Sequence, residues 1–386
     1  MGYVGMTRRR IIYLSGTRAD FGLMRHALEV IAADPRLDLS VAVTGMHLHE
    51  EFGHTVDEIA ASGLRIAAQI RTSVAERNRP AMARAVGHTL MGLTNLLETE
   101  RPDALLLLGD RGEMLAGAIA ALHLGVPAVH IHGGERSGTV DEPMRHAISK
   151  IAAYHFCATL ESRERLIAMG EAPDRVFQVG APGLDDLPPV LAAPREAALE
   201  ALGLTHDAPY VLVLFHPVVQ EAEDAAAQTA SLIEGLRAAG AHSAFDVVWL
   251  APNADAGSNA ILHELAALND CNWRRITHLP RARYLLALRH AAALLGNSSS
   301  GIIEAASFGT PVVNVGRRQH LRERNSGTVD AGIDPEAISA ALRSALNGGR
   351  PPVQNIYGDG QAAGRINELL ATLPLFPDLL NKANRY

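Results

Sequence analysis

The segment 130–146 reads HIHGGERSGTVDEPMRH and gathers side chains that could do chemistry into one short stretch. Its histidines His130 and His132 stand two residues apart, as in some metal sites. Its carboxylates Glu135 and Asp141 could instead transfer protons. The segment by itself therefore leaves two kinds of site open, a metal centre and an acid–base group.

A metal centre would find further ligands in the segment MHLHEEFGH. That segment contains His47, His49, Glu50 and His54. Neither cluster has the helical His-Glu-x-x-His spacing, and neither contains a cysteine. His130 and His132 should point to the same face of a predicted strand, but one histidine of such a pair is usually a hydrogen-bonded structural residue. We therefore favour the carboxylates and expect no metal.

The acidic pair Asp141–Glu142 also has a purely structural interpretation. It precedes PMRHAISK, and Pro143 stands where a first-turn proline is favoured, so the pair could begin a helix. Capping a helix and taking part in catalysis are compatible roles for these carboxylates.

Short apolar runs that alternate with helix-period segments indicate strands buried on both faces and joined by crossover helices. The expected strands lie in 10–16, 37–45, 68–72, 103–110, 127–134, 150–159 and 176–183, and then in 210–217, 245–253, 281–301 and 302–316. The two series meet near 180–196, a stretch rich in Gly, Pro and acidic residues. The pattern predicts an α/β protein with two doubly wound, Rossmann-like domains, 1–183 and 184–365, facing a central cleft.

Polar side chains follow several of these expected strands. They are Arg18, Asp110, His130, His132, His216 and Asn297. Ligands of doubly wound sheets bind at the carboxyl ends of the strands, where the strand order reverses. If both domains present those ends to the cleft, these residues converge there.

The loop GNSSSGIIEAASFGTP predicts an anion site, because small polar residues precede a helix whose first N–H groups are free. Ser299, Ser300 and Gly301 form its turn, and Glu304 should lie in the first helical turn, where it could accept hydrogen bonds from sugar hydroxyls. A plain N-cap with a glutamate that balances the helix dipole is the alternative. Since Gly-x-Gly-x-x-Gly and P-loop motifs are absent, we expect the diphosphate of a nucleotide-sugar here, bound by the second domain.

Composition narrows the class of protein further. The 386 residues carry a net charge of −7, which argues against a general nucleic-acid binder. No apolar run approaches the roughly 18–20 residues that span a bilayer, and the run 11–14 after the first arginines is much shorter than a signal-peptide core. The only cysteines, Cys157 and Cys271, are far apart, so we expect a reduced, cytoplasmic protein.

Taken together, the motifs resemble a known family. They are SGTRADFGLM, VTGMHLHEEFG, LLGDRGEMLAGAIAA, HIHGGE, DEPMRHAISKIAAYHF, VGAPGLD, FHPV, PNADAG, GNSSSGIIEAASFGTPVVNVGRRQ and YGDG. In this order, from about residue 11 to 370, they are similar to the hydrolysing UDP-N-acetylglucosamine 2-epimerases of sialic-acid-type biosynthesis. FHPV alone is a weak signal, whereas the ordered set is specific.

The resemblance implies the GT-B fold, with a final helix in 366–386 that crosses back to the first domain. It also implies a homodimer and a reaction without metal or nicotinamide. UDP would leave C1 of the sugar as a proton leaves C2, which gives a glycal with a C1=C2 double bond. Water would then add with inverted C2 stereochemistry, to give a free manno-configured sugar and UDP. The substrate would be UDP-N-acetylglucosamine or a 2,4-diacetamido-2,4,6-trideoxy relative from legionaminic-acid-type biosynthesis.

The resemblance also assigns residues to roles. The acid–base group would contain Asp110, Glu135 and Asp141, with Arg145 beside it. The UDP-binding set would contain Arg18, His216, Asn253, Ser299, Ser300, Gly301, Glu304 and Arg322, and His216 would take part in catalysis as well. The non-hydrolysing branch carries a glutamate where this chain has His132, and Glu135 stands three residues later. Which carboxylate is the acid and which the base stays open.

Two other functions use the same residues. A GT-B glycosyltransferase would share the nucleotide site but transfer the sugar to an acceptor, and a non-enzymatic sensor would only bind the nucleotide-sugar. GDRGE and the segment 130–146 argue against the transferase, and an intact set of carboxylates argues against the sensor.

Overall fold

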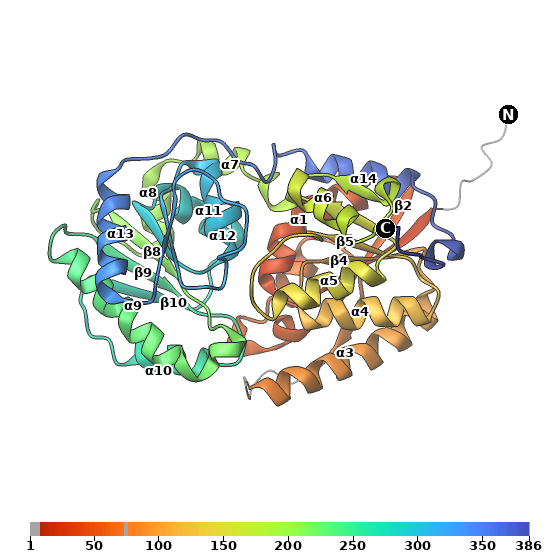
Figure 1. Cartoon of the computed structure of the whole chain (residues 1–386), viewed down its shortest axis with the longest axis horizontal. Coiled ribbons are helices and arrows are strands. Elements are labelled where there is room, and N and C mark those ends of the chain that lie inside the picture. The colour runs from red at the N-terminus through yellow and green to blue at the C-terminus, as the bar shows by residue number, and fades with distance from the viewer. Residues whose placement is uncertain (1–7, 73–75, 77, 386) are drawn as a thin grey trace.

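The computed structural model describes residues 8–72, 76 and 78–385, and it contains two parallel sheets (Figure 1). The first sheet contains β1 (Arg9–Ser15), β2 (Leu37–Thr44), β3 (Ile66–Ile70), β4 (Ala104–Leu108), β5 (Ala128–Ile131), β6 (Tyr154–Cys157) and β7 (Val176–Gln178), in the order β3-β2-β1-β4-β5-β6-β7. The second contains β8 (Tyr210–Leu214), β9 (Asp246–Leu250), β10 (Trp273–Ile276), β11 (Ala293–Gly296), β12 (Val312–Val315) and β13 (Thr328–Ala331), in the order β10-β9-β8-β11-β12-β13. We call the parts built on these sheets the first and the second lobe. The strand order reverses between β1 and β4 and between β8 and β11, so the predicted doubly wound α/β architecture is confirmed.

Helices cover both faces of each sheet. Those that follow strands of the first sheet are α1 (Arg18–Ala33), α2 (Val56–Ala61), α3 (Arg79–Glu100), α4 (Gly112–His123), α5 (Asp141–Ile151) and α6 (Leu160–Ala168). The later helices are α7 (Pro188–Ala192), α8 (Arg195–Leu202), α9 (Ala225–Gly240), α10 (Ser258–Ala266), α11 (Arg281–His290), α12 (Ser299–Ile303), α13 (Pro335–Asn347) and α14 (Ala362–Thr372). Among the described residues, no helix combines the length and the apolar character that a membrane span requires.

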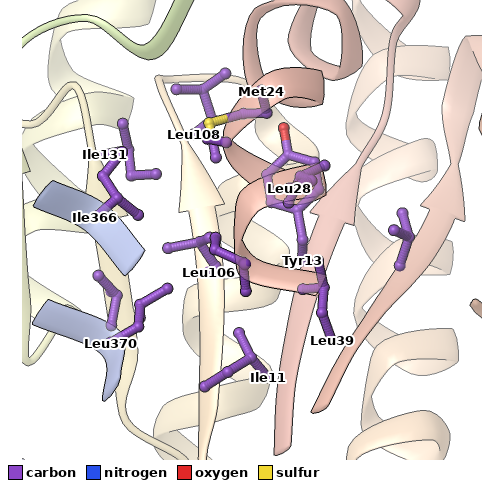
Figure 2. Close-up of a cluster of buried hydrophobic side chains, with 14 of the residues drawn as sticks. Ile11, Tyr13, Met24, Leu28, Leu39, Leu106, Leu108, Ile131, Ile366 and Leu370 are labelled. Atoms are coloured by element: carbon purple, nitrogen blue, oxygen red, sulfur yellow. The ribbon is translucent and has the colours of Figure 1, made fainter. Parts of the chain in front are cut away.

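The period of two in each strand explains how both sheet faces become buried. In β1, Ile11 and Tyr13 pack in the core that includes α1 and α14 (Figure 2). Ile12 and Leu14 pack with α3 and α4 on the opposite face. In β8, residues 210 and 212 belong to the core that includes α8 and α11, and residues 211 and 213 to the core that includes α9 and α13. Continuous apolar strands are therefore the sequence signature of these sheets.

The C-terminal helix α14 lies on the first lobe, although it follows the whole second lobe in sequence (Figure 1). Its Ile366 and Leu370 are buried in the same core as Ile11 and Leu106 (Figure 2). The carboxylate of Asp185 accepts a hydrogen bond of 3.1 Å from the backbone N–H of Ala362, at the start of the helix. The helix is shorter than the predicted 366–386 segment and begins four residues earlier.

The domain bounds 1–183 and 184–365 stay a prediction, and residues 1–7 of the first lie outside the described residues. Two strands were not predicted, β10 with the sequence WRRI and β13 with the sequence TVDA. Both are edge strands of the second sheet, and their half-exposed, partly charged sequences lack the apolar run of an inner strand.

Candidate functional site

A cavity of about 310 Å³ lies between the two lobes. Its walls include residues that follow β4 and β8, among them Asp110 and His216, together with the loops after β9 and β11. The carboxyl ends of the strands beside both points of order reversal therefore meet at one place. Ten residues expected in the site line this cavity: Arg18, Asp110, Glu135, Arg145, His216, Asn253, Ser299, Ser300, Glu304 and Arg322. Asp141 and Gly301 do not line it.

Asp110 and Arg145 form the first carboxylate–guanidinium pair of the cavity. Asp110 follows β4, and Arg145 lies one turn into α5 with only 1% of its side chain exposed. Arg145 also donates to the backbone carbonyl of Glu135 at 3.0 Å and lies 3.5 Å from the hydroxyl of Ser137. Burial lowers the pKa of Arg145 to about 9, which still leaves it charged at neutral pH. Arg145 therefore holds the side chain of Asp110 in a fixed place on the cavity wall.

Glu135 forms the second pair, with Arg322 from the second lobe. One carboxylate oxygen of Glu135 contacts Arg322, and the other contacts Nδ1 of His132. Burial lowers the pKa of His132 to about 3, so the ring is neutral and donates its Nδ1 proton to Glu135. Glu135 is only 3% exposed, and both of its oxygens are occupied.

Asp141 is the first residue of α5 and stands 3.7 Å from a guanidinium nitrogen of Arg318. The N-cap residue Val140 makes no side-chain capping bond, and Glu142 instead accepts the backbone N–H groups of Ser137 and Gly138 in the preceding loop at 3.0 and 2.6 Å. Asp141 is thus left beside the second lobe, at the margin of the cavity instead of on its wall.

The expectation that His130 and His132 share one strand face is wrong. His130 lies inside β5, where Nδ1 contacts the hydroxyl of Ser149 at 3.0 Å and Nε2 contacts the carbonyl of Gly109 at 2.7 Å. His132 follows the strand with a positive φ of 61°, which turns its side chain out of the strand alternation. Both ring nitrogens of His130 are therefore engaged in holding β4, β5 and α5 together.

The histidines of the other cluster also have protein partners. His47 contacts the hydroxyls of Ser15 and Thr55, each at 2.8 Å, and His49 contacts the carbonyl of Thr72 at 2.6 Å. Within residues 8–72, 76 and 78–385, no three His, Cys, Asp or Glu side chains are grouped so that they could hold a metal ion. These contacts give the histidines structural roles.

His216 follows β8 and lines the cavity. Its Nδ1 accepts the backbone N–H of Asn253 at 3.2 Å, and its own backbone N–H donates to the side chain of Asn297 at 2.8 Å. Burial, assisted by the positive charge of Arg318, lowers the pKa of His216 to about 3. The neutral ring that accepts at Nδ1 carries its proton on Nε2, so it is a hydrogen-bond donor to the cavity.

The serine turn after β11 differs from its prediction in two respects. α12 contains only five residues, and Glu304 is its C-cap instead of a member of its first turn. Glu304 is 2% exposed and forms an ion pair with Arg281. Gly301 is buried, and a Cβ at this position would stand 3.0 Å from side-chain atoms of Leu294 and Val312, so a larger residue would have to displace these side chains slightly. Ser299 and Ser300 remain on the cavity wall.

These distances describe a cavity with one carboxylate–arginine pair on the first lobe, a second pair that joins the two lobes, and hydrogen-bond donors on the second lobe. A model of a known family matches most of the same chain, residues 29–371, and its description is UDP-N-acetylglucosamine 2-epimerase. The chain belongs to the UDP-N-acetylglucosamine 2-epimerase family.

Two relatives from this epimerase family are similar to the chain over most of its length. A Legionella pneumophila protein named UDP-N,N′-diacetylbacillosamine 2-epimerase (hydrolyzing) is 47% identical over 98% of this chain and 100% of its own length. The UDP-N-acetylglucosamine 2-epimerase of Neisseria meningitidis serogroup B is 31% identical over 91% of either chain.

Solved structures agree with the fold. The crystal structure of UDP-GlcNAc 2-epimerase from Neisseria meningitidis bound to UDP-GlcNAc has a TM-score of 0.77 at 18% identity, covering 94% of this chain and 99% of that one. A calicheamicin glycosyltransferase has a TM-score of 0.53 at 15% identity, covering 95% of this chain and 100% of that one. The predicted GT-B fold is confirmed.

The sequence did not predict several polar residues of this epimerase-family cavity. They are Glu58, Arg111, His278, Arg281 and Arg318. Arg111 reaches across the cleft to Asp255, with 3.1 Å between their side-chain atoms, and Asp255 is also bonded to Asn253. Arg111 stands directly after Asp110, in the GDRGE motif, and Arg318 stands in the VGRRQ motif. Arg111 and Arg318 both follow predicted strands, and this position could have been used to predict that they line the cavity.

Proposed function

We propose that the chain is a hydrolysing UDP-sugar 2-epimerase. The observation that carries this proposal is the pairing of Asp110 with Arg145 and of Glu135 with Arg322 in one cavity. Each carboxylate is paired with an arginine, so its oxygens are held at one place in the cavity. The opposite wall supplies the neutral donor His216 and further arginines, which suit a diphosphate.

The proposed reaction begins with an elimination. The C2–H bond of the sugar breaks as its proton passes to a carboxylate, the C1–O bond breaks with its electron pair going to UDP, and a C1=C2 double bond forms. A C2 proton becomes acidic only as positive charge grows at C1, so the site must stabilise the departing diphosphate and hold the base at the same time. Water then adds its hydroxyl to C1 and a proton to C2 with inverted configuration.

Each wall of the cavity has its part in this reaction. We assign the carboxylates Asp110 and Glu135 to proton transfer at C2, with Asp141 in a supporting place beside Arg318. Arg18, Arg318, Arg322 and the Nε2 proton of His216 are assigned to the diphosphate, together with Ser299 and Ser300. Asn253 fixes the ring of His216 through its backbone N–H. Glu304 and Arg281 would lie toward the ribose.

We propose UDP-N,N′-diacetylbacillosamine, a 2,4-diacetamido-2,4,6-trideoxy sugar nucleotide, as the preferred substrate, and UDP-N-acetylglucosamine as the second candidate. The support is the name of the relative with 47% identity, compared with 31% for the relative named for UDP-N-acetylglucosamine. This substrate would place the enzyme in the biosynthesis of nonulosonic acids of the sialic and legionaminic type. We further propose that the protein is a cytoplasmic homodimer. Light scattering of the purified protein would measure the mass of the dimer.

Proton NMR in D₂O, with each of the two UDP-sugars in turn, tests the proposed function. We expect free UDP and a free manno-configured sugar with deuterium at C2, formed faster from the diacetamido substrate. A product without deuterium at C2 would rule out the elimination. Stable UDP-sugar in both tubes, followed by turnover when a sugar acceptor is added, would establish a glycosyltransferase instead.

A further inference from the structure

Arg322 is a residue of the second lobe whose guanidinium is bound by the first. It follows β12, and its Nε donates to the side chain of Gln319 at 2.6 Å. Its Nη1 contacts the carboxylate of Glu135 across the cleft. Only 8% of the Arg322 side chain is exposed. This cation therefore lies on the cavity wall while it is paired with a group that we assign to proton transfer.

Glu135 is held from several sides in this arrangement. Its two oxygens are taken by Arg322 and by the neutral His132, and its backbone carbonyl accepts a hydrogen bond from Arg145. A carboxylate that receives a hydrogen bond from a cation is a poorer proton acceptor than one without it. The pair with Arg322 therefore restrains the base that the reaction needs.

The pair of Asp110 with Arg145 provides a contrast. Both of its members belong to the first lobe, and Arg145 has further acceptors in the same lobe. Arg322 instead joins the two lobes and shares the cavity wall with Arg18, Arg318 and His216. A diphosphate bound among these donors would offer Arg322 more negative charge and more acceptor oxygens than one carboxylate. The two anions would then compete for one guanidinium.

We propose that Arg322 exchanges partners during the reaction: its guanidinium releases the carboxylate of Glu135 and binds the diphosphate of the nucleotide. This inference rests on the proposed function and adds an order of events to it. Glu135 becomes an effective proton acceptor only once the nucleotide is in place. As the C1–O bond breaks, negative charge grows on UDP and holds Arg322 more firmly, so departure of the leaving group and release of the base are coupled at one side chain.

Competition predicts that removing the charge of Glu135 strengthens nucleotide binding. The test is a double-mutant cycle on UDP affinity, measured by isothermal titration calorimetry with Glu135→Gln, Arg322→Gln and the double variant. We expect Glu135→Gln to bind UDP about tenfold more tightly than the wild type. In the Arg322→Gln background, the same substitution should change the UDP affinity by less than about twofold. An equal effect of Glu135→Gln in both backgrounds, or weaker UDP binding by Glu135→Gln, would overturn the exchange.

The matched control background is Arg317→Gln. Arg317 is an exposed arginine five residues earlier in the same loop, and it does not line the cavity. Glu135→Gln should tighten UDP binding there as it does in the wild type, because only a neighbouring charge has been lost. Loss of the effect with Arg317→Gln would mean that general electrostatics, and not a partner exchange, explains the affinities.

Proton uptake on UDP binding gives a second readout that a merely structural role of Arg322 would not change. Titrations in two buffers with different ionisation enthalpies should show more uptake near pH 6 for the wild type than for Glu135→Gln or Arg322→Gln. Equal uptake in all three proteins would contradict the release of Glu135. Turnover of the UDP-sugars is measured separately. An active enzyme that lacks the proton uptake would contradict only the partner exchange, whereas a protein without turnover would contradict the proposed function.

Discussion

The guanidinium of Arg18, on the first lobe, donates a hydrogen bond of 2.8 Å to Nδ1 of His278, on the second lobe. Nε2 of the same imidazole donates to the carboxylate of Glu58 at 2.7 Å. His278 thus stands between two residues of the first lobe, and its hydrogen bond lowers the pKa of Glu58 against the opposing effect of burial. The contact holds the side chain of Arg18, which lines the cavity.

We expect His278→Ala to weaken UDP binding about tenfold, because Arg18 would lose one of the two acceptors that orient it, the other being the carbonyl of Thr277 at 2.9 Å, and binding would have to order the side chain. Calorimetric titration with UDP measures the change. His263→Ala removes an exposed histidine of α10 in the same lobe and should leave the affinity as it is. If the UDP affinity of His278→Ala is unchanged, the orientation of Arg18 by His278 does not contribute to UDP binding.

Asp110→Asn should lower turnover by roughly 10²–10⁴-fold while UDP still binds. The amide keeps the size of the side chain and can still accept a hydrogen bond from Arg145, but it cannot take a proton from C2. Single-substrate kinetics and UDP titration provide the two measurements. Asp174→Asn, an exposed aspartate of the same lobe, is the control. Near-normal turnover in Asp110→Asn would exclude Asp110 from proton transfer.

Arg145→Met should destabilise the protein by about 2–4 kcal/mol, since it leaves partly buried acceptors without their donor. The Asp110 side chain is 21% exposed, and water offsets part of the loss there. Urea denaturation followed by circular dichroism measures the free energy of unfolding. Arg136→Met, nine residues earlier and 44% exposed, should change it by less than about 0.5 kcal/mol. Similar values for the two variants would show that the buried pair contributes little.

A buried cluster beneath α5 should make stability depend on acid. Glu171 accepts hydrogen bonds from His155 at 2.9 Å, Lys150 at 2.8 Å and Lys382 at 2.5 Å. Although burial acts to raise the pKa of Glu171, these bonds lower it to about 2. A depressed carboxyl pKa stabilises the fold above the ordinary glutamate value, and that stabilisation disappears as the pH falls toward 2.

We therefore expect the wild type to lose about 2–3 kcal/mol from this cluster between pH 5 and pH 2. Glu171→Gln should lack this part of the loss and should already be less stable at pH 7. Thermal unfolding at a series of pH values measures both effects. The exposed Glu161 supplies the control variant Glu161→Gln, which should follow the wild type. Parallel stability profiles for Glu171→Gln and the wild type would contradict the assignment.

Chelators should leave turnover intact. His130 uses both ring nitrogens for hydrogen bonds within the first lobe, and His49 is bonded to a backbone carbonyl. Incubation with EDTA before the assay, followed by dialysis, checks this expectation. A loss of activity that zinc or another divalent ion restores would bring the metal-site interpretation back.

The sequence by itself determined the architecture and ten of the residues that line the cavity. Apolar strands such as ALLLL can be buried only inside a covered parallel sheet, and side chains that follow such strands must meet at one sheet edge. Asp110, His216 and Ser299 were predictable for that reason. Edge strands, whose exposed side chains carry no apolar pattern, were not.

Only the tertiary structure decided which charges meet. The contacts of Arg322 with Glu135, of Arg18 with His278 and of Arg111 with Asp255 join residues more than 140 positions apart in the chain. Periodicity reports which face of one element is apolar, whereas an ion pair depends on how two lobes are placed against each other. Gly301 shows the converse: its motif predicts an anion turn, but the residue is buried and packs closely against side chains of the sheet.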